Sequence, residues 1–290
     1  MALLLKLLGS LPLPFLHLLG ALAGGLLWWL PSKRKRVALR NISACLPNLS
    51  DTEQRKLARS ALKHEAQTLL ECPYLWFAPA DKVSKLIRER RGAELVDEAL
   101  KQGKGVILLT AHLGSWEAAG MTQSLLHPMT GLYKPQKGEM DRVIFEGRSR
   151  FGVKLVATDG GKMRQVLRPL LENHETVYFM PDQDPPEGRG VFVPFFGVNA
   201  HTPVLVSKLV QHTGAPVVYF YSERVPGGRG FIVHYRPAPP EIHDPDLMKS
   251  AAAVNAGIEA CVRECPEQYW WGYERFRRRP PGETSFYPRE

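Results

Sequence analysis

The clearest hydrophobic pattern in the chain is the run Gly-Val-Ile-Leu-Leu-Thr at residues 105–110, which predicts a short buried strand of a parallel sheet. The sequence Ala-His-Leu-Gly-Ser-Trp-Glu follows directly, and a helix is predicted to begin at Glu117 with Ser115 as its N-cap. This pattern places His112 at the carboxyl end of a strand. In open α/β sheets, ligands bind at that edge.

Strand and helix signals alternate along the remaining chain. Residues 36–90 have a polar, helical pattern in which Asp51 is the predicted N-cap of a long helix. Strands are predicted over residues 129–133, 154–156, 176–180, 215–221 and 231–235. Helices are predicted over residues 93–102, 140–150, 162–172, 202–212 and 246–265. The alternation predicts an α/β fold with a mainly parallel central sheet and helices on both faces.

The N-terminal stretch, residues 7–31, is apolar, and its only titratable side chain is His17. It is long enough to cross a hydrocarbon core of about 30 Å. Two tryptophans near its end and the basic residues 33–36 after it are typical of a membrane boundary with the following domain in the cytoplasm. We therefore expect residues 1–31 to form a membrane-anchoring helix. Residues 32–290 would form a single α/β domain whose N-terminal part, about 36–102, is helical.

Two other interpretations of this stretch remain open. Residues 21–23 (Ala-Leu-Ala) resemble the cleavage site of a signal peptide, although the apolar run continues beyond them. Pro12 and Pro14 permit a broken helix that lies in one leaflet of the membrane instead of spanning it.

The charge balance favours an anionic partner. There are 38 Lys and Arg against 29 Asp and Glu, a formal net charge of +9. Such a balance suits nucleic acid, a phosphorylated lipid surface or an acidic protein, and the apolar N-terminal stretch favours the membrane over nucleic acid. The four cysteines have neither the density of a disulfide framework nor the spacing of a zinc site, so we interpret them as ordinary thiols. We expect no metal and no redox cofactor.

His112 and Glu117 are the candidate catalytic residues. Gly114 between them permits a turn that would bring the Glu117 carboxylate onto the imidazole. The chain lacks a Gly-x-Ser-x-Gly nucleophile motif at this point. We therefore expect His112 to take a proton from a substrate hydroxyl, which then attacks an activated acyl group. Glu117 would fix the tautomer of the ring. The alternative is a buried structural histidine satisfied by a local carboxylate.

A second group of residues is predicted to bind substrate. Asp182 and Gln183 follow the strand at 176–180 and would lie at the same sheet edge as His112; Asp182 could bind a hydroxyl or orient an arginine, or belong to an ordinary polar loop. Phe195 belongs to the apolar run 192–197, which suits either an acyl chain or core packing.

Basic residues supply the remaining candidates. Arg148 and Arg150 could bind phosphate, or be solvated cations at a helix end. Residues 275–280 form a basic patch that follows the aromatic residues 269–271, a combination suited to an anionic membrane surface.

The spacing His112-x4-Glu117 is similar to the signature of the glycerolipid-type acyltransferases. With residues 41–47, 181–183, 191–197 and 269–280, it makes nearly the whole chain resemble the bacterial late acyltransferases of lipid A biosynthesis, the lauroyl and myristoyl transferases. The resemblance implies an inner-membrane enzyme whose active site faces the cytoplasm. It further implies transfer of a fatty acyl group from acyl carrier protein to a hydroxyl of a lipid A precursor, with His112 and Glu117 as the catalytic pair.

The expected partners are therefore acyl carrier protein and an anionic lipid acceptor in the membrane, with no nucleic acid and a monomeric chain. The acyl-carrier thioester would be a co-substrate, and no cofactor is expected. An acyltransferase that acts on another glycerophospholipid or glycolipid, and a non-catalytic membrane lipid-binding protein, are the alternatives.

Overall fold

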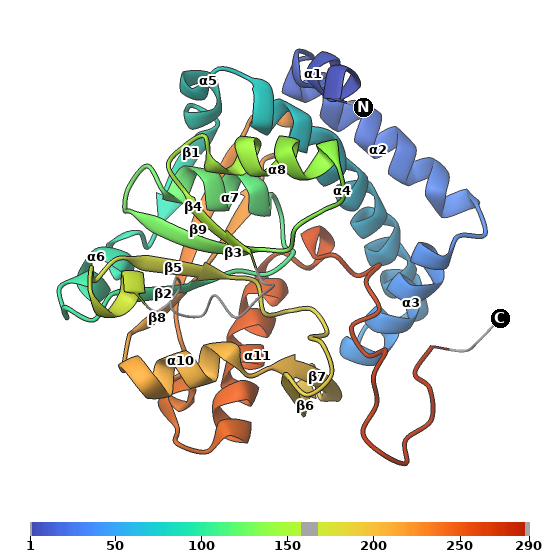
Figure 1. Cartoon of the computed structure of the whole chain (residues 1–290). Coiled ribbons are helices and arrows are strands. Elements are labelled where there is room, and N and C mark those ends of the chain that lie inside the picture. Colours follow the sequence, from blue (N-terminus) through green and yellow to red (C-terminus); the bar gives the residue numbers. More distant parts are fainter. Residues whose placement is uncertain (1, 158–167, 288–290) are drawn as a thin grey trace.

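The central sheet is built from parallel strands with one antiparallel pair (Figure 1). The computed structural model describes residues 2–157 and 168–287. Within them, seven strands lie in the order β1-β9-β8-β2-β5-β3-β4, and only the neighbours β8 and β9 are antiparallel. Their bounds are β1 Ile87–Arg91, β2 Val106–Leu109, β3 Met129–Tyr133, β4 Lys154–Ala157, β5 Thr176–Phe179, β8 Val217–Arg224 and β9 Phe231–Pro237. The prediction of a mainly parallel sheet is confirmed.

Helices cover both faces of the sheet, as the side-chain alternation of β2 requires. Val106 and Leu108 pack in one hydrophobic cluster with residues of α6 and α7. Ile107 and Leu109 pack in another cluster with residues of α10 and α11. The bounds of these four helices are α6 Glu94–Leu100, α7 Trp116–Gln123, α10 Leu205–Thr213 and α11 Leu247–Glu264.

Six further α-helices of the described part of the chain lie along the top and the right-hand side of the view in Figure 1. They are α1 Ala2–Gly9, α2 Leu13–Trp29, α3 Lys33–Cys45, α4 Asp51–Phe77, α5 Ala80–Ser84 and α8 Glu139–Ser149. The N-cap of α4 is Ser50, so the prediction of Asp51 is wrong by one residue. The Ser50 hydroxyl accepts from the Glu53 amide, and the Glu53 carboxylate accepts from the Ser50 amide, which completes a capping box.

Three strands were not predicted from the pattern. The edge strand β1 reads Ile-Arg-Glu-Arg-Arg, and it forms because its backbone pairs with β9. Charged side chains on an edge strand are a common protection against aggregation. β6 Gly190–Phe195 and β7 Val198–Pro203 form an antiparallel hairpin, so α10 begins later than predicted. Of the helix predicted over 162–172, residues 162–167 lie outside the described residues, and residues 168–171 are helical.

The apolar N-terminal stretch forms two helices instead of the single helix predicted. Among the described helices, none is by itself long and apolar enough to cross a membrane; Leu3–Gly9 and Leu13–Trp29 pass that test only together, and they are bent by 111°. Pro12, which precedes α2, marks the break. Membrane attachment of residues 1–31 therefore stays a prediction.

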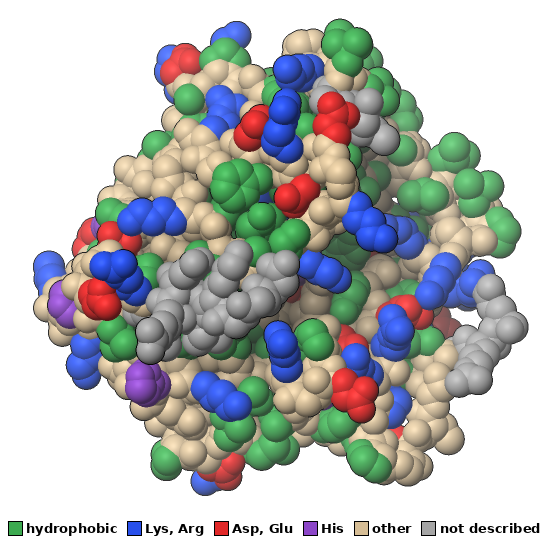
Figure 2. Space-filling view, in the orientation of Figure 1, with side chains coloured by type: hydrophobic (Ala, Val, Ile, Leu, Met, Phe, Trp, Pro, Cys, Tyr) green, Lys and Arg blue, Asp and Glu red, His purple; other side chains and the backbone are tan. Residues whose placement is uncertain are grey.

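Helix α2 has two faces of different character. One face, which includes Leu13, Leu16, His17 and two glycines, is buried, and α2 packs closely along α4. The opposite face exposes Phe15, Leu18, Leu22, Leu26 and Trp29. Figure 2 shows hydrophobic side chains gathered along the outer edge that α1 and α2 form in Figure 1.

Gly24 sets the close approach of α2 to α4. A Cβ atom at Gly24 would lie 2.4 Å from the Cα of Lys63, whereas one at the neighbouring Gly25 would meet nothing closer than the Lys63 side chain at 4.0 Å. Gly24→Ala should therefore push the helices apart and destabilise the fold by about 1–3 kcal/mol. Gly25→Ala should stabilise it by up to about 1 kcal/mol through helix propensity. Thermal unfolding in detergent measures both changes, and equal effects of the two substitutions would contradict this packing.

Candidate active site

Two neighbouring parallel strands bring His112 and Asp182 together. Leu109 at the end of β2 is paired with Phe179 at the end of β5. His112 follows Leu109 by the same number of residues as Asp182 follows Phe179. The side chains therefore meet at the carboxyl edge of the sheet, as the sequence predicts for the two loops.

The Asp182 carboxylate binds His112 twice. The backbone N–H of His112 donates to Oδ2 of Asp182 over 2.9 Å, and the ring Nδ1 lies 2.9 Å from Oδ1. An ionised carboxylate only accepts hydrogen bonds, so Nδ1 carries a proton. In the neutral imidazole, Nε2 then has its lone pair available, and the side-chain amide Nε2 of Gln183 lies 3.2 Å from it. This arrangement leaves Nε2 of His112 as a proton acceptor.

Neighbouring charges and hydrogen bonds keep Asp182 ionised although it is buried. The residue is 2 % exposed. Burial by itself raises the pKa of its carboxyl group, but the charge and hydrogen bonds of His112, together with the charge of Arg275, outweigh burial and hold the pKa below its usual value. The imidazole is 20 % exposed, so substrate can reach it.

Two indoles border the imidazole. The ring centroid of His112 lies 5.0 Å from that of Trp116 and 6.2 Å from that of Trp270, with both contacts edge-to-face. The backbone N–H of Trp270 also donates to the carbonyl oxygen of His112. These contacts restrict the ring and shield it from bulk water on two sides.

The turn after His112 is built around Gly114, whose φ of +59° is in the left-handed region. A Cβ atom there would lie 1.9 Å from the carbonyl oxygen of Ser222, so no other residue fits without displacing the backbone. The N–H of Gly114 donates to the carbonyl oxygen of Gln268, and that of Ser115 to the carbonyl oxygen of Ser222. Ser115 is the N-cap of α7 as predicted, but its side chain makes no capping hydrogen bond.

The predicted contact between Glu117 and His112 is wrong. The Glu117 carboxylate accepts hydrogen bonds from Nε and Nη2 of Arg148 and, over 3.2 Å, from Nε1 of Trp76. The turn at Gly114 is bound to β8, so the first turn of α7 directs Glu117 toward α4 and α8, while His112 faces the loop after β5. Asp182 therefore takes the position at Nδ1 that was expected for Glu117.

Arg148 and Glu117 form an ion pair in which the Glu117 side chain is buried and the Arg148 side chain is 32 % exposed. Burial lowers the pKa of the Arg148 guanidinium, but the charge of Glu117 and its hydrogen bonds raise it by more, so Arg148 remains a cation. The pair borders a small pocket of about 50 Å³ between α7, β3 and β5. The other side chains around this pocket are mostly apolar, and they include Met121, Met129 and Leu155.

The other predicted substrate-binding residues have structural contacts. Arg150 donates to the carbonyl oxygens of Leu75 and Ala78 at the end of α4, so its charge caps that helix. Phe195 is 1 % exposed and packs in the hydrophobic core, which agrees with the core-packing interpretation of residues 192–197.

Much of the C-terminal basic patch is also internal. Arg275 is buried and donates to the carbonyl oxygen of His201 and to Oγ1 of Thr202. Arg278 and Arg279 form ion pairs with Asp184 and Glu283. The interpretation of residues 275–280 as a membrane-binding patch is therefore wrong for Arg275, which is buried, while Arg278 and Arg279 hold the C-terminal segment against the domain. Arg277 is exposed, and a membrane contact of that side chain stays a prediction.

The sequence model of the bacterial lipid A biosynthesis acyltransferases matches residues 1–278. The chain belongs to this family. It is 30 % identical to the lipid A biosynthesis lauroyltransferase of Escherichia coli (strain K12), over 96 % of this chain and 90 % of that protein. The palmitoleoyltransferase of the same strain has the same identity and coverage. The myristoyltransferase of that strain is 26 % identical over 96 % of this chain and 84 % of its own length.

These findings confirm the resemblance stated from the motifs and show that the chain is an acyltransferase. The sequence pattern predicted that Asp182 and His112 lie at the same edge of the sheet, but it did not predict the contact between them. A signal was nevertheless available. Both residues follow buried strands at the same distance, and adjacent parallel strands bring such positions together.

Asp182→Asn should change the tautomer of His112 in this acyltransferase. An asparagine offers one acceptor and one amino group in place of two acceptors. The backbone N–H of His112 requires the acceptor, so the amino group would face Nδ1 and the ring proton would move to Nε2. Nitrogen NMR of the histidine rings, at a pH where the imidazole is neutral, distinguishes the two tautomers. The same tautomer in both proteins would contradict the hydrogen bonding described above.

Proposed function

We propose that this acyltransferase adds a secondary acyl chain to a lipid A precursor, with an acyl-carrier-protein thioester as donor and a hydroxyl group as acceptor. Family membership and the names of the relatives support the reaction class. The observation that carries the mechanism is the hydrogen bonding of His112, because Asp182 binds Nδ1 and leaves Nε2 as the base.

His112 would act directly on the acceptor. Its Nε2 takes the proton of the hydroxyl group as the oxygen attacks the carbonyl carbon of the thioester. The carbon–sulfur bond then breaks, and the imidazolium returns the proton to the leaving sulfur. Asp182 stabilises the imidazolium between these two steps. A thioester is already activated, so the reaction needs neither a nucleophilic side chain nor a cofactor.

Glu117 and Arg148 have a different proposed task from the one expected for Glu117. Glu117 binds Nε and Nη2 of Arg148 and so fixes the plane of the guanidinium beside the apolar pocket. Arg148 would bind an anionic or developing negative charge on a substrate. The pocket next to it is large enough only for part of an acyl chain, so its apolar side chains would contact the end of the donor chain.

The proposed location is the cytoplasmic face of the bacterial inner membrane. Exposed apolar side chains cover the outer faces of α1 and α2, and basic residues 33–36 begin α3 directly after them. This combination suits helices that lie at an anionic membrane surface. The formal charge of +9 also suits an acidic carrier protein as the soluble partner. A monomeric chain, with no nucleic-acid partner, is part of the same proposal.

Removal of the base tests the mechanism. His112→Ala should lower the rate of acyl transfer from acyl carrier protein by about 10²–10⁴-fold, because that is the usual contribution of a positioned general base. His212→Ala changes an exposed histidine on α10 and is the matched control. The assay uses purified enzyme in detergent, with a hydroxyl-bearing lipid A precursor as acceptor.

Mass spectrometry of lipid A then tests the acceptor in cells. Cells that lack the gene should lose one secondary acyl chain, and the gene for the unaltered enzyme, but not for His112→Ala, should restore it. Near-normal transfer by His112→Ala would exclude the mechanism. Unchanged lipid A together with active transfer to another phospholipid would exclude the acceptor.

A further inference from the structure

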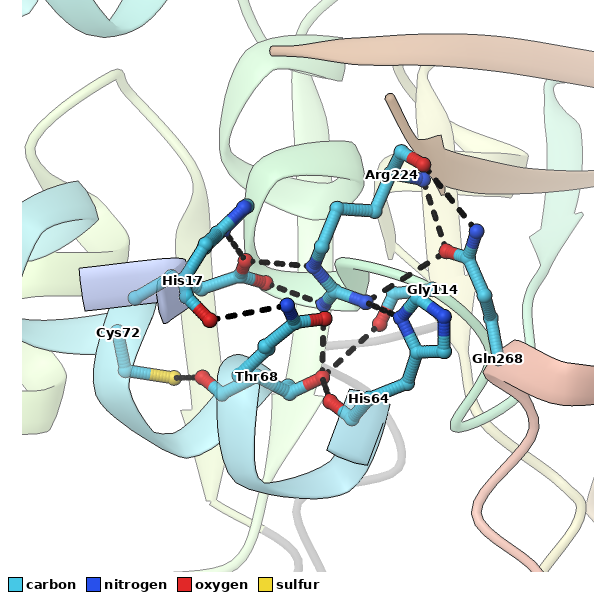
Figure 3. Close-up of polar contacts among 9 residues, drawn as sticks. His17, His64, Thr68, Cys72, Gly114, Arg224 and Gln268 are labelled. Carbon is cyan, nitrogen blue, oxygen red and sulfur yellow. Dashed lines mark hydrogen bonds and ion pairs between the residues drawn. The ribbon is translucent and has the colours of Figure 1, made fainter. Parts of the chain in front are cut away.

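A buried arginine lies behind the turn that carries the candidate catalytic residues. Arg224 ends β8 and is 2 % exposed. Its Nε and Nη2 donate to the Glu71 carboxylate over 2.8 and 2.7 Å, and Nη2 also donates to Oγ1 of Thr68 over 2.7 Å (Figure 3). Its Nη1 lies 3.3 Å from Nδ1 of His64. Three residues of α4 thus surround one guanidinium. The proposed mechanism uses none of them.

Helix α2 joins this cluster through His17. Its Nε2 lies 2.8 Å from Oε2 of Glu71, and the side-chain amide of Gln67 donates to the His17 carbonyl oxygen over 3.0 Å (Figure 3). Burial raises the pKa of Glu71, but the charge and hydrogen bonds of Arg224 and His17 outweigh it and lower the pKa to about 2. Helix α2 therefore contributes one hydrogen-bond partner, His17, to the buried and ionised carboxylate of Glu71.

The other side of the cluster reaches the turn at Gly114. The Arg224 backbone N–H donates to the side-chain oxygen of Gln268 over 2.8 Å, and the Gln268 amide donates back to the Arg224 carbonyl oxygen. The Gln268 carbonyl oxygen in turn accepts from the N–H of Gly114 over 3.0 Å. Thr68 adds a longer contact, 3.4 Å from its Oγ1 to the Gly114 carbonyl oxygen.

These contacts form a continuous connection from α2 to the turn. Loss of one partner would leave a charge or a polar group buried without compensation, which is costly in a low-dielectric interior. The remaining partners would therefore be expected to move. The turn has little freedom to absorb such movement, because Gly114 lies against the Ser222 carbonyl oxygen.

We propose that His17 and Arg224 are positioning residues: the connection His17–Glu71–Arg224–Gln268 holds the Gly114 turn, and through it the imidazole of His112. Helix α2 then helps to position the candidate active site, in addition to any role at the membrane. The expected effect on acyl transfer rests on the proposed function. The expected support of the Gly114 turn by α2 does not depend on that function.

The test removes the contact at its far end. His17→Leu should raise the hydrogen-exchange rates of the Gly114 and Ser115 amides by about tenfold, while the amides of β2 stay protected. The kcat for acyl transfer should fall, and the KM for the acyl-carrier donor should stay the same. His17→Gln, whose amide can donate to Glu71, should restore both the protection and kcat.

His127→Leu is the matched control. It removes an imidazole–carboxylate contact of similar length, 3.2 Å to Asp97, before the start of β3 and therefore at the opposite edge of the sheet. It should leave the exchange at Gly114 unchanged. Thr68→Val removes the hydroxyl that contacts Arg224, the Gly114 carbonyl oxygen and the His64 carbonyl oxygen. It gives a second variant with the same exchange readout if His17→Leu does not fold.

Unchanged exchange at Gly114 in the folded variants would overturn the proposal, and so would an equal rise in His127→Leu. A rise with kcat unchanged would overturn the link to His112. If exchange at Gly114 rises in His17→Leu but the unaltered enzyme shows no acyl transfer, the proposed function is excluded. The support of the turn by α2 would still be established in that case.

Discussion

One buried carboxylate defines the candidate active site. Asp182 accepts hydrogen bonds from both the backbone and the ring of His112, so a single side chain fixes the position and the protonated nitrogen of the imidazole. The contact exists because β2 and β5 are adjacent and parallel. Moving either strand by one residue would reverse the faces of its side chains and separate the pair. The hydrogen bonding between Asp182 and His112 therefore makes the proposed proton transfer depend on the order and register of the central sheet.

The two acidic residues near His112 have separate tasks. Asp182 binds the imidazole, and Glu117 binds Arg148 and Trp76 across the neighbouring helices. The spacing from His112 to Glu117 includes a left-handed turn at Gly114 and the start of α7, which turns Glu117 away from the ring. A histidine and a carboxylate within one motif therefore need not contact each other. Here the motif places a base and an arginine-binding carboxylate on two sides of one loop.

Sequence patterns predicted the strands correctly wherever the local preference of the residues and their tertiary environment agree. The buried strand before His112 and the hairpin of β8 and β9 carry strong apolar signals, and the structure confirms them. The charged strand β1 has no such signal, and its conformation depends on its pairing with β9 and on the packing of Ile87 against the core. The partner of Glu117 could not be predicted either. Arg148 reaches it only through the packing of α8 against α4 and α7, which no local pattern reports.

The N-terminal helices show the same distinction between composition and context. Their apolar sequence alone predicts an anchor, yet α2 buries a histidine and two glycines against α4 and exposes apolar side chains on its other face. This two-sided character explains why a polar residue lies within a hydrophobic stretch. His17 belongs to the interior of the domain, where it binds the carboxylate of Glu71.

A structure of the full chain with a bound hydroxyl-bearing lipid A precursor tests the central claim most directly. The distance that decides it joins the acceptor hydroxyl oxygen to Nε2 of His112. The account predicts that the hydroxyl replaces the Gln183 amide and lies within about 2.6–3.2 Å of Nε2, with Asp182 still bound to Nδ1. A hydroxyl bound at Glu117 instead, or a His112 ring released from Asp182 in that complex, would contradict it.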